Sequence, residues 1–168
     1  MTEIVLPNDT NGLGNMMGGR LMYLMDKCAA VSAQRHANGV CVTAAVDSVE
    51  FQAPICQNEV VIIESWVNRA FRTSMEVELV VVAENPRAQT RRQCNRAFFT
   101  FVALGDDGLP VSVPPVHPET DEESARHEQA AKRREVRLVF AGRLKLEEAV
   151  HIKDDLMAAL AGERDVVS

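Results

Sequence analysis

The chain has 168 residues, of which 46% are hydrophobic and 25% charged, enough for one domain with a sizeable core and too few for two ordinary ones. Asp and Glu number 24 against 18 Lys and Arg, and the net charge of −6 opposes binding to nucleic acid or to anionic membranes. The start carries no basic signal region, and no apolar run approaches the roughly 20 residues that cross a bilayer, so we expect a soluble, cytoplasmic protein without membrane insertion.

A glycine-rich segment, residues 7–19, comes before the first predicted helix. Gly18 and Gly19 at the helix start would present free backbone N–H groups and the positive end of the helix dipole. Such a site suits a carbonyl oxygen that becomes an oxyanion. The alternative is a flexible turn in which Asn15 caps the helix.

The first helix is predicted over residues 18–36, and the Asn38-Gly39 pair that follows suits a helix stop. Asp26 lies at the edge of its apolar face, and none of its neighbours three or four residues away is a cation. This placement suits a catalytic base in a partly apolar cleft, and the alternative is an exposed carboxylate at the edge or a buried one that is hydrogen-bonded. The apolar positions at helical spacing are Leu21, Leu24, Met25 and Cys28.

Gly19 and Asp26 lie about 10 Å apart along this helix, because each residue adds about 1.5 Å. One helix cannot easily bring both to one carbonyl group. If both serve one reaction, a two-fold dimer that exchanges these parts is the economical solution.

β-branched and apolar residues then predict four strands, with Pro54 closing the first. In the third strand apolar residues alternate with Ser74, Glu76 and Glu78, which is typical of a strand covered on one face. One early helix followed by several strands favours an α+β fold, with an antiparallel sheet wrapped around the helix. The predicted strands cover residues 40–51, 60–67, 74–81 and 97–104.

Beyond Pro114-Pro115 the composition changes sharply. Residues 119–137 are rich in Glu, Ala, Lys and Arg, which predicts a solvated helix that lies on the domain. Residues 146–160 show a weaker amphipathic pattern, and we expect residues 163–168 to fray. The chain therefore divides into a domain of residues 1–116 and a C-terminal helical extension of residues 117–168 that packs on it.

Several common kinds of site are missing from the sequence. The four cysteines are far apart and no histidine stands at metal-ligand spacing, so we expect buried, reduced thiols and no metal site. No G-x-S-x-G nucleophile motif occurs either, which argues against a serine hydrolase. The cysteines are Cys28, Cys41, Cys56 and Cys94.

Four segments stand in an order and spacing that is specific when taken together: PNDTNGLGNMMGGRLMYLMDKCAAVSAQRH, VTAAVDSVEFQAP, FRTSMEVEL and AFFTFVAL…VPPVHPET. With Asn11 before the glycine pair and Asp26 after it, residues 3–137 closely resemble hotdog-fold acyl-CoA thioesterases of the cytosolic acyl-CoA hydrolase type. The resemblance implies a curved antiparallel sheet wrapped around a long central helix, with two hotdogs pairing to build the active sites.

The resemblance further implies hydrolysis of acyl-CoA to a free fatty acid and coenzyme A, with no cofactor beyond the substrate itself. Asp26 would act as general base or nucleophile, and Asn11 of the partner chain would position water or the carbonyl group. The N–H groups of Gly18 and Gly19 would stabilise the oxyanion. Because one chain holds both catalytic residues, we expect a homodimer with two equivalent sites, and a trimer of dimers stays open.

Coenzyme A carries phosphates that need a basic patch. Six arginines between residues 69 and 96 outnumber the glutamates there, and the match to FRTSM favours Arg72, Thr73 and Ser74, with Arg91, as coenzyme A contacts. The alternative for each arginine is a solvated charged surface. The six are Arg69, Arg72, Arg87, Arg91, Arg92 and Arg96.

Two other functions are compatible with this fold. A noncatalytic acyl-CoA sensor would keep the binding site without the chemistry. A hotdog hydratase or dehydratase needs a histidine with a carboxylate on the central helix, and His36 lies late for that role. Leu21, Met22 and Met25 could line an acyl tunnel, but Met and Leu on a central helix are usually core residues, so the sequence leaves the acyl length open.

Overall fold

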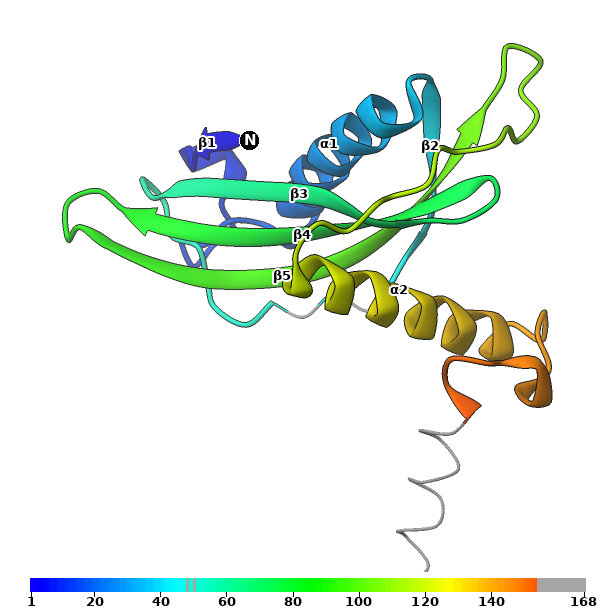
Figure 1. Ribbon diagram of the computed structural model, residues 1–168. Helices are drawn as coiled ribbons and strands as arrows, with labels where there is room; N and C mark the ends of the chain where they lie inside the picture. The colour runs from blue at the N-terminus through cyan, green and yellow to red at the C-terminus, as the bar shows by residue number, and fades with distance from the viewer. Residues whose placement is uncertain (48, 50, 154–168) are drawn as a thin grey trace, which may run out of the picture. The chain divides into compact units, whose positions relative to one another are not determined.

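The structure is a computed structural model that describes residues 1–47, 49 and 51–153. It divides into two compact units, Met1–Val116 and His117–Ser168. The first unit contains α1 and all of the strands, and the second contains α2 (Figure 1). No helix in the described part of the chain is both long and apolar enough to span a membrane.

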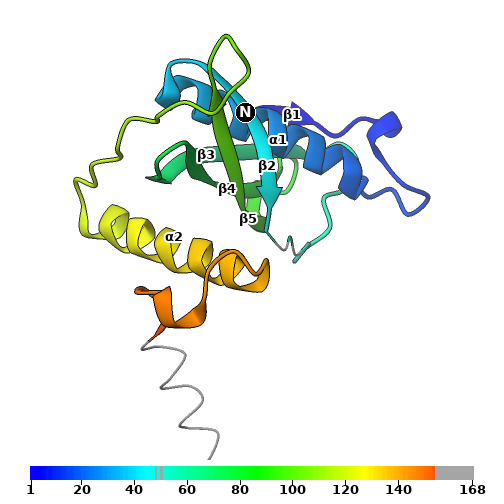
Figure 2. The same cartoon turned by 90° about the vertical axis from the view of Figure 1, so that its right-hand side faces the viewer.

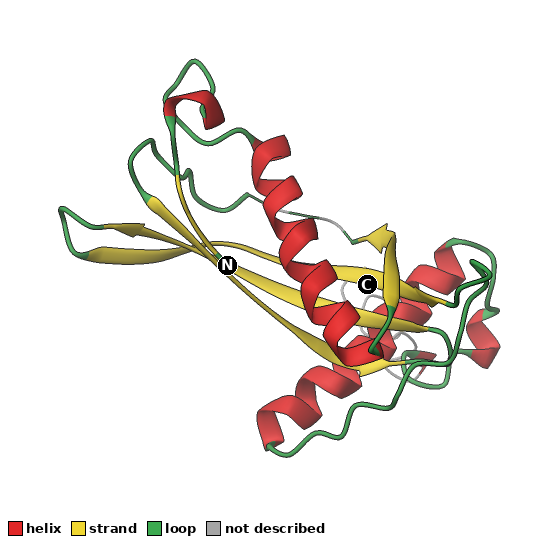
Figure 3. Ribbon diagram, turned by 90° about the horizontal axis from the view of Figure 1, so that it is seen from above, coloured by secondary structure: helices red, strands yellow, loops and turns green. Residues whose placement is uncertain are grey.

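Helix α1 (Gly18–Ala37) lies across one face of the sheet (Figure 3). It begins after the extended residue Met17 and ends at Asn38, whose φ of 51° is the left-handed conformation that terminates helices. The helix predicted over residues 18–36 is therefore confirmed, together with its stop. Its buried side chains are Leu21, Leu24, Met25, Cys28, Ala29 and Ala33.

The sheet has five antiparallel strands in the order β1-β3-β4-β5-β2. It curls around α1, as Figures 1 and 2 show from two sides, which confirms the hotdog arrangement. Strands β1 and β2 form its two edges. The strand bounds are β1 (Thr2–Ile4), β2 (Val40–Val46), β3 (Val60–Ala70), β4 (Ser74–Asn85) and β5 (Thr90–Leu104).

The core of the first unit lies between α1 and the concave face of the sheet. Met25 from α1 belongs to one buried cluster with apolar side chains of β4 and β5, among them Met75 and Phe99, all at most 1% exposed. Each such side chain contributes about 1.5–3 kcal/mol through burial. This packing fixes which residues of α1 and β2 stay at the edge of the core, where the candidate site is found.

The first predicted strand is shorter than expected. β2 ends at Val46, after an irregularity between Thr43 and Ala45, whereas the prediction continued to Phe51. Val49 and Phe51 lie outside any strand, and positions 48 and 50 lie outside the described residues. High β-propensity reflects how a side chain packs, and here it does not keep the backbone in the sheet.

The face of β4 that points away from α1 is not solvated, contrary to the predicted half-covered strand. Glu76 is 0% and Glu78 1% exposed. The Asn68 amide donates to Glu76 Oε1 at 3.1 Å and to Glu78 Oε2 at 2.9 Å, while Arg96 Nε donates to Glu78 Oε1 at 2.6 Å. Period-two alternation identifies the two faces of a strand, but it does not reveal polar partners that allow burial.

In the second unit, α2 (Asp121–Phe140) begins with a capping box in which Glu123 N–H donates to Thr120 Oγ1 at 3.2 Å. Glu135 is buried, and its carboxylate accepts hydrogen bonds from the backbone and ring of His151 and from Ile152 N–H. Burial raises the pKa of Glu135, but these hydrogen bonds outweigh it and hold the pKa below its usual value.

The predicted helix in the extension is confirmed, although Ala130 and Ala131 are buried. A short 3-10 helix, η2 (Leu146–Glu148), follows it. The later part of the amphipathic pattern and the fraying expected at residues 163–168 lie outside the described residues. The packing of the extension on the first unit stays a prediction.

Candidate active site

Asn11 occupies an exposed loop between the 3-10 helix η1 (Pro7–Asp9) and α1. Its Oδ1 accepts hydrogen bonds from Leu13 N–H at 2.9 Å and Asn15 N–H at 3.2 Å, so the side-chain carbonyl shapes its own loop. Among the described residues, its Nδ2 group donates to no protein acceptor. The amide is therefore held in orientation with two donor hydrogens available to a ligand.

The Asn11 loop is fastened to the start of α1. Arg20 Nε donates to Asp9 Oδ1 at 2.8 Å, and Met17 N–H donates to the Asp9 carbonyl at 2.8 Å. On the other side, Met16 N–H donates to the Ile55 carbonyl at 2.7 Å. These contacts make the loop and the helix N-terminus one rigid part of the surface.

The N-terminus of α1 has no side-chain cap. Met17 stands at the cap position, and its carbonyl accepts from Arg20 N–H and Leu21 N–H. Within residues 1–47, 49 and 51–153, the N–H groups of Gly18 and Gly19 donate to no protein acceptor. The alternative of Asn15 as a helix cap is wrong, because the Asn15 side chain instead accepts from Cys56 Sγ at 3.6 Å.

Asp26 lies in the third turn of α1, half-buried at the edge of the core. Its Oδ1 accepts a hydrogen bond from Thr43 Oγ1 at 2.6 Å. Thr43 lies on the same face of β2 as the buried Cys41, two residues before it, and therefore points towards α1. The other Asp26 oxygen has no donor in the described part of the chain.

Thr43 is not among the residues that the sequence singles out. In a run of β-branched residues a threonine looks like any other strand former, and only the packing of β2 beside α1 brings its hydroxyl to Asp26. The irregularity that follows Thr43 in β2 is the kind of local distortion that reorients side chains near functional sites.

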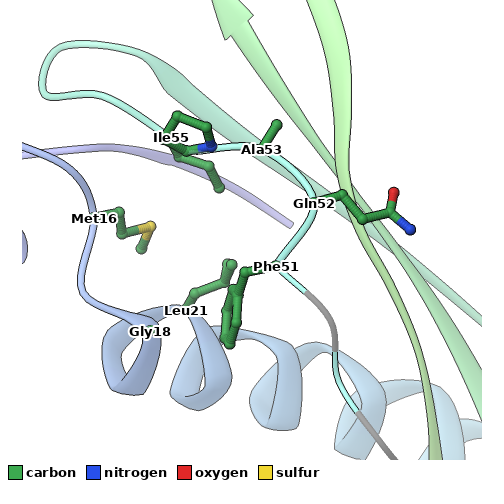
Figure 4. A pocket seen from close by; sticks show the side chains of 8 residues that line it. Met16, Gly18, Leu21, Phe51, Gln52, Ala53 and Ile55 are labelled. Atoms are coloured by element: carbon green, nitrogen blue, oxygen red, sulfur yellow. The ribbon is translucent and has the colours of Figure 1, made fainter.

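A pocket of about 380 Å³ opens beside the N-terminus of α1 (Figure 4). Gly18 forms part of one wall, and a Cβ atom added there would lie 3.3 Å from Phe51 Cζ. Glycine at this position thus lets the aromatic ring approach the helix backbone. The apolar side chains that line the pocket are Met16, Leu21, Phe51, Ala53, Pro54 and Ile55.

The predicted coenzyme A contacts do not all come together. Arg72 is exposed in the turn between β3 and β4 and forms no ion pair among the described residues. Thr73 follows it in this turn, and Ser74 is the first residue of β4. Arg91 pairs with Glu84 at the opposite end of β4, roughly 33 Å away along the strand. One chain therefore cannot use both arginines on the same phosphate.

Two further arginines of the expected basic patch are neutralised by carboxylates. Arg96 pairs with Glu78, and Arg92 pairs with Glu59 and also donates to the Pro54 carbonyl. The Arg92 hydrogen bonds lower the pKa of Glu59. Arg92 thereby anchors the segment that carries the pocket wall, which is a structural role.

The remaining sequence candidates lie away from this site or differ from expectation. His36 stands in the last turn of α1, and its Nε2 lies 2.8 Å from the Pro114 carbonyl. Cys56 is exposed, whereas we expected buried thiols, and the other three cysteines are buried. No group of three His, Cys, Asp or Glu side chains that could hold a metal is found within the described residues.

Comparison with known proteins identifies clear relatives. The family model described as Thioesterase superfamily matches residues 13–89. The uncharacterized acyl-CoA thioester hydrolase YkhA of Bacillus subtilis is 43% identical over 132 residues, which are 79% of this chain and 77% of that protein. Mouse acyl-coenzyme A thioesterase 11 is 41% identical over 158 residues, or 93% of this chain, but the match spans only 26% of the mouse protein.

Solved structures of acyl-CoA thioesterases also match this chain. An apo-hexameric acyl-CoA thioesterase matches with a TM-score of 0.81 and 39% identity, over 84% of this chain and 90% of that one. A Staphylococcus aureus acyl-CoA hydrolase in complex with butyryl coenzyme A matches with a TM-score of 0.77 and 34% identity, over 85% and 89% of the two chains. Three further structures of that hydrolase carry an alanine in place of an asparagine, an aspartate or a threonine.

Proposed function

Because the chain belongs to the thioesterase superfamily, we propose that it hydrolyses acyl-CoA to coenzyme A and a free carboxylic acid, with Asp26 and Asn11 as its catalytic residues. The observation that carries this proposal is the Asp26 carboxylate, half-buried beside the core and held at 2.6 Å by Thr43. A fixed carboxylate with one free oxygen suits a general base.

The substituted residues of the Staphylococcus aureus hydrolase support this assignment. Its asparagine and aspartate are 15 positions apart, and its threonine follows the aspartate by 17 positions. Asn11, Asp26 and Thr43 have the same two spacings. Two matching separations across a loop, a helix and a strand favour equivalent roles for all three.

In the proposed reaction, the free oxygen of Asp26 takes a proton from water as the water oxygen attacks the thioester carbonyl. The carbonyl oxygen becomes an oxyanion beside the N–H groups of Gly18 and Gly19, where loss of one donor costs about 3–4 kcal/mol. Collapse of the tetrahedral intermediate breaks the carbon–sulfur bond, and the proton held by Asp26 passes to the departing thiolate. The Asn11 amide orients the water or the carbonyl, and no cofactor is required.

The reacting parts belong to different protomers in this proposal. Asp26 follows Gly18 by eight residues, about 12 Å along the helix axis, so one α1 cannot present both to one thioester. Strand β2 is a sheet edge whose Val40 and Val42 are 62% and 42% exposed. An exposed apolar edge favours pairing with a second copy of itself, which builds a homodimer with two equivalent sites.

The names of related structures also suggest an assembly larger than a dimer. Neighbours with solved structures are described as hexameric thioesterases, so three dimers joined into a hexamer are the natural extension of the proposal. A rat relative is named a cytosolic acyl coenzyme A thioester hydrolase, which supports a cytoplasmic reaction.

Coenzyme A binding is assigned to the β3–β4 turn. Arg72 is exposed there without a carboxylate partner among the described residues. The hydroxyl groups of Thr73 and Ser74 can donate hydrogen bonds to a phosphate. Arg91 is left out of this site, because it lies at the far end of β4 and pairs with Glu84.

The test is the release of coenzyme A from acyl-CoA, followed with a thiol reagent for wild type, Asp26→Asn and Asn11→Ala. We expect wild-type turnover and a loss of at least about a hundredfold in each variant, within the usual contribution of general base catalysis. Wild-type turnover in both variants would refute the catalytic pair. Tight acyl-CoA binding without any release by wild type would instead support a noncatalytic sensor on the same fold.

A further inference from the structure

The pocket at the start of α1 lies directly beside the free N–H groups. Gly18 belongs both to the pocket wall and to the pair whose N–H groups lack a protein acceptor among the described residues. If a carbonyl oxygen binds at these N–H groups, one of the two substituents of the carbonyl carbon therefore lies at the mouth of the pocket. In a thioester the two substituents are the acyl chain and the sulfur of coenzyme A.

The pocket lining favours a hydrocarbon chain. Among the described residues, six lining side chains are apolar and Gln52 supplies the one polar side chain. The pantetheine arm of coenzyme A carries two amide groups, and burying them without partners costs about 1–3 kcal/mol each. An alkyl chain has no such cost and gains about 0.8 kcal/mol per buried methylene. The lining thus favours the acyl side of the thioester.

Backbone hydrogen bonds hold the two walls of the pocket, and the side chain of Phe51 packs between them. Met16 N–H donates to the Ile55 carbonyl at 2.7 Å, and Gln52 N–H donates to the Cys94 carbonyl of β5 at 3.0 Å. The ring of Phe51, next to the anchored Gln52, lies against Gly18 and Leu21 (Figure 4) and is 53% exposed. It is held by packing alone among the described residues.

We propose that this pocket receives the acyl chain, and that Phe51 is the specificity-determining residue that limits its length. This inference rests on the proposed hydrolysis of acyl-CoA. The volume of about 380 Å³ lies near the lower end of the range for small-molecule sites, which suits a short to medium acyl group. Removing the Phe51 ring opens the pocket to longer chains.

The experiment measures kcat/KM for saturated acyl-CoA substrates from acetyl to palmitoyl, for wild type, Phe51→Ala and Phe51→Leu. For wild type we expect a rise of about fourfold per added methylene until the pocket is full, and then a fall. In Phe51→Ala the optimum moves to longer chains, and the ratio of palmitoyl to butyryl hydrolysis rises at least tenfold. Phe51→Leu, which restores part of the bulk, gives a smaller shift.

Phe140→Ala is the matched control, because it removes the same ring from a position that is 89% exposed and outside the pocket. Its chain-length profile should equal that of wild type. An equal loss on every substrate in Phe51→Ala would place the pantetheine arm at Phe51 and overturn the proposal, as would an unchanged profile.

A second readout separates this inference from the proposed function. Calorimetry with thioether analogues of acyl-CoA, which cannot be hydrolysed, gives the Kd for each chain length. The same shift in Phe51→Ala is expected there even if wild type hydrolyses nothing, a result that would refute the hydrolase alone. If the Kd does not depend on chain length in wild type or in Phe51→Ala, the acyl pocket alone is refuted.

Discussion

Replacing Thr43 with valine removes one hydroxyl and tests how Asp26 is held. Valine keeps the branched shape that β2 needs, but it cannot donate the 2.6 Å hydrogen bond to Asp26 Oδ1. Because one end of that bond is a carboxylate, it belongs to the class that contributes about 1.5–3 kcal/mol. Thr43 is exposed, so we take the lower end of that range.

A loss of about 1.5 kcal/mol corresponds to a fall of roughly tenfold in kcat, since 1.36 kcal/mol is one factor of ten. We expect KM to change little, because the hydroxyl contacts Asp26 and lies outside the proposed coenzyme A site at Arg72. The assay is release of coenzyme A at saturating substrate. The exposed thiol of Cys56 requires a blank without substrate, because it also reacts with the thiol reagent.

Two variants separate positioning from a general structural effect. Thr43→Ser restores the hydroxyl and should recover most of the turnover, and Thr90→Val makes the same exchange at an exposed position on β5 and should leave turnover unchanged. Turnover of Thr43→Val within twofold of wild type would refute the reasoning. So would a serine variant as slow as the valine variant at unchanged Tm.

Three other predictions address binding, assembly and stability. Arg72→Ala should raise KM for acyl-CoA severalfold with kcat largely kept, whereas Arg87→Ala at the far hairpin should leave both unchanged in the same steady-state assay. Val42→Lys on the exposed edge of β2 should convert the dimer to monomer in light scattering and abolish hydrolysis, and an active dimer would contradict edge pairing. Because Arg92 lowers the folded-state pKa of Glu59 below the ordinary 4.5, the ionised carboxylate stabilises the fold above that pH and the contribution is lost as pH falls below it. The Tm difference between wild type and Glu59→Gln should therefore shrink below about pH 4.5, and a constant difference would show that the pair is not responsible.

The sequence predicts the helices and strands better than it predicts which of their side chains are buried. Helical spacing and the Asn38-Gly39 stop locate α1 almost to the residue, because both are local signals. Burial of Glu76 and Glu78 depends on Asn68 and Arg96, which come from other strands, so no local pattern reports it. Four of the five strands are predicted, but β1 is missed, β5 begins at Thr90 rather than at residue 97, and the burial of the second face of β4 is not predicted.

In the candidate site, too, only some of the residues could be predicted from the sequence. Asp26 stands out as an unpaired charge on an apolar helix edge, and its separation from Gly19 along the helix favours a site shared by two chains. Asn11 is indicated only by the resemblance to the thioesterases. Thr43 and Phe51 carry no such signal. Each gains its place from packing between distant segments, Thr43 beside α1 and Phe51 against Gly18.

The central claim is hydrolysis of acyl-CoA at a site that takes Asp26 from one protomer and Asn11 from the other. Co-expressing differently tagged Asn11→Ala and Asp26→Ala chains, and purifying the mixed dimer through both tags, tests it directly. Both defects fall in one of its two sites and leave the other intact, so we predict about half of wild-type coenzyme A release per dimer, from two inactive parents. A mixed dimer as inactive as its parents would show that each chain supplies its own pair, and would contradict the account.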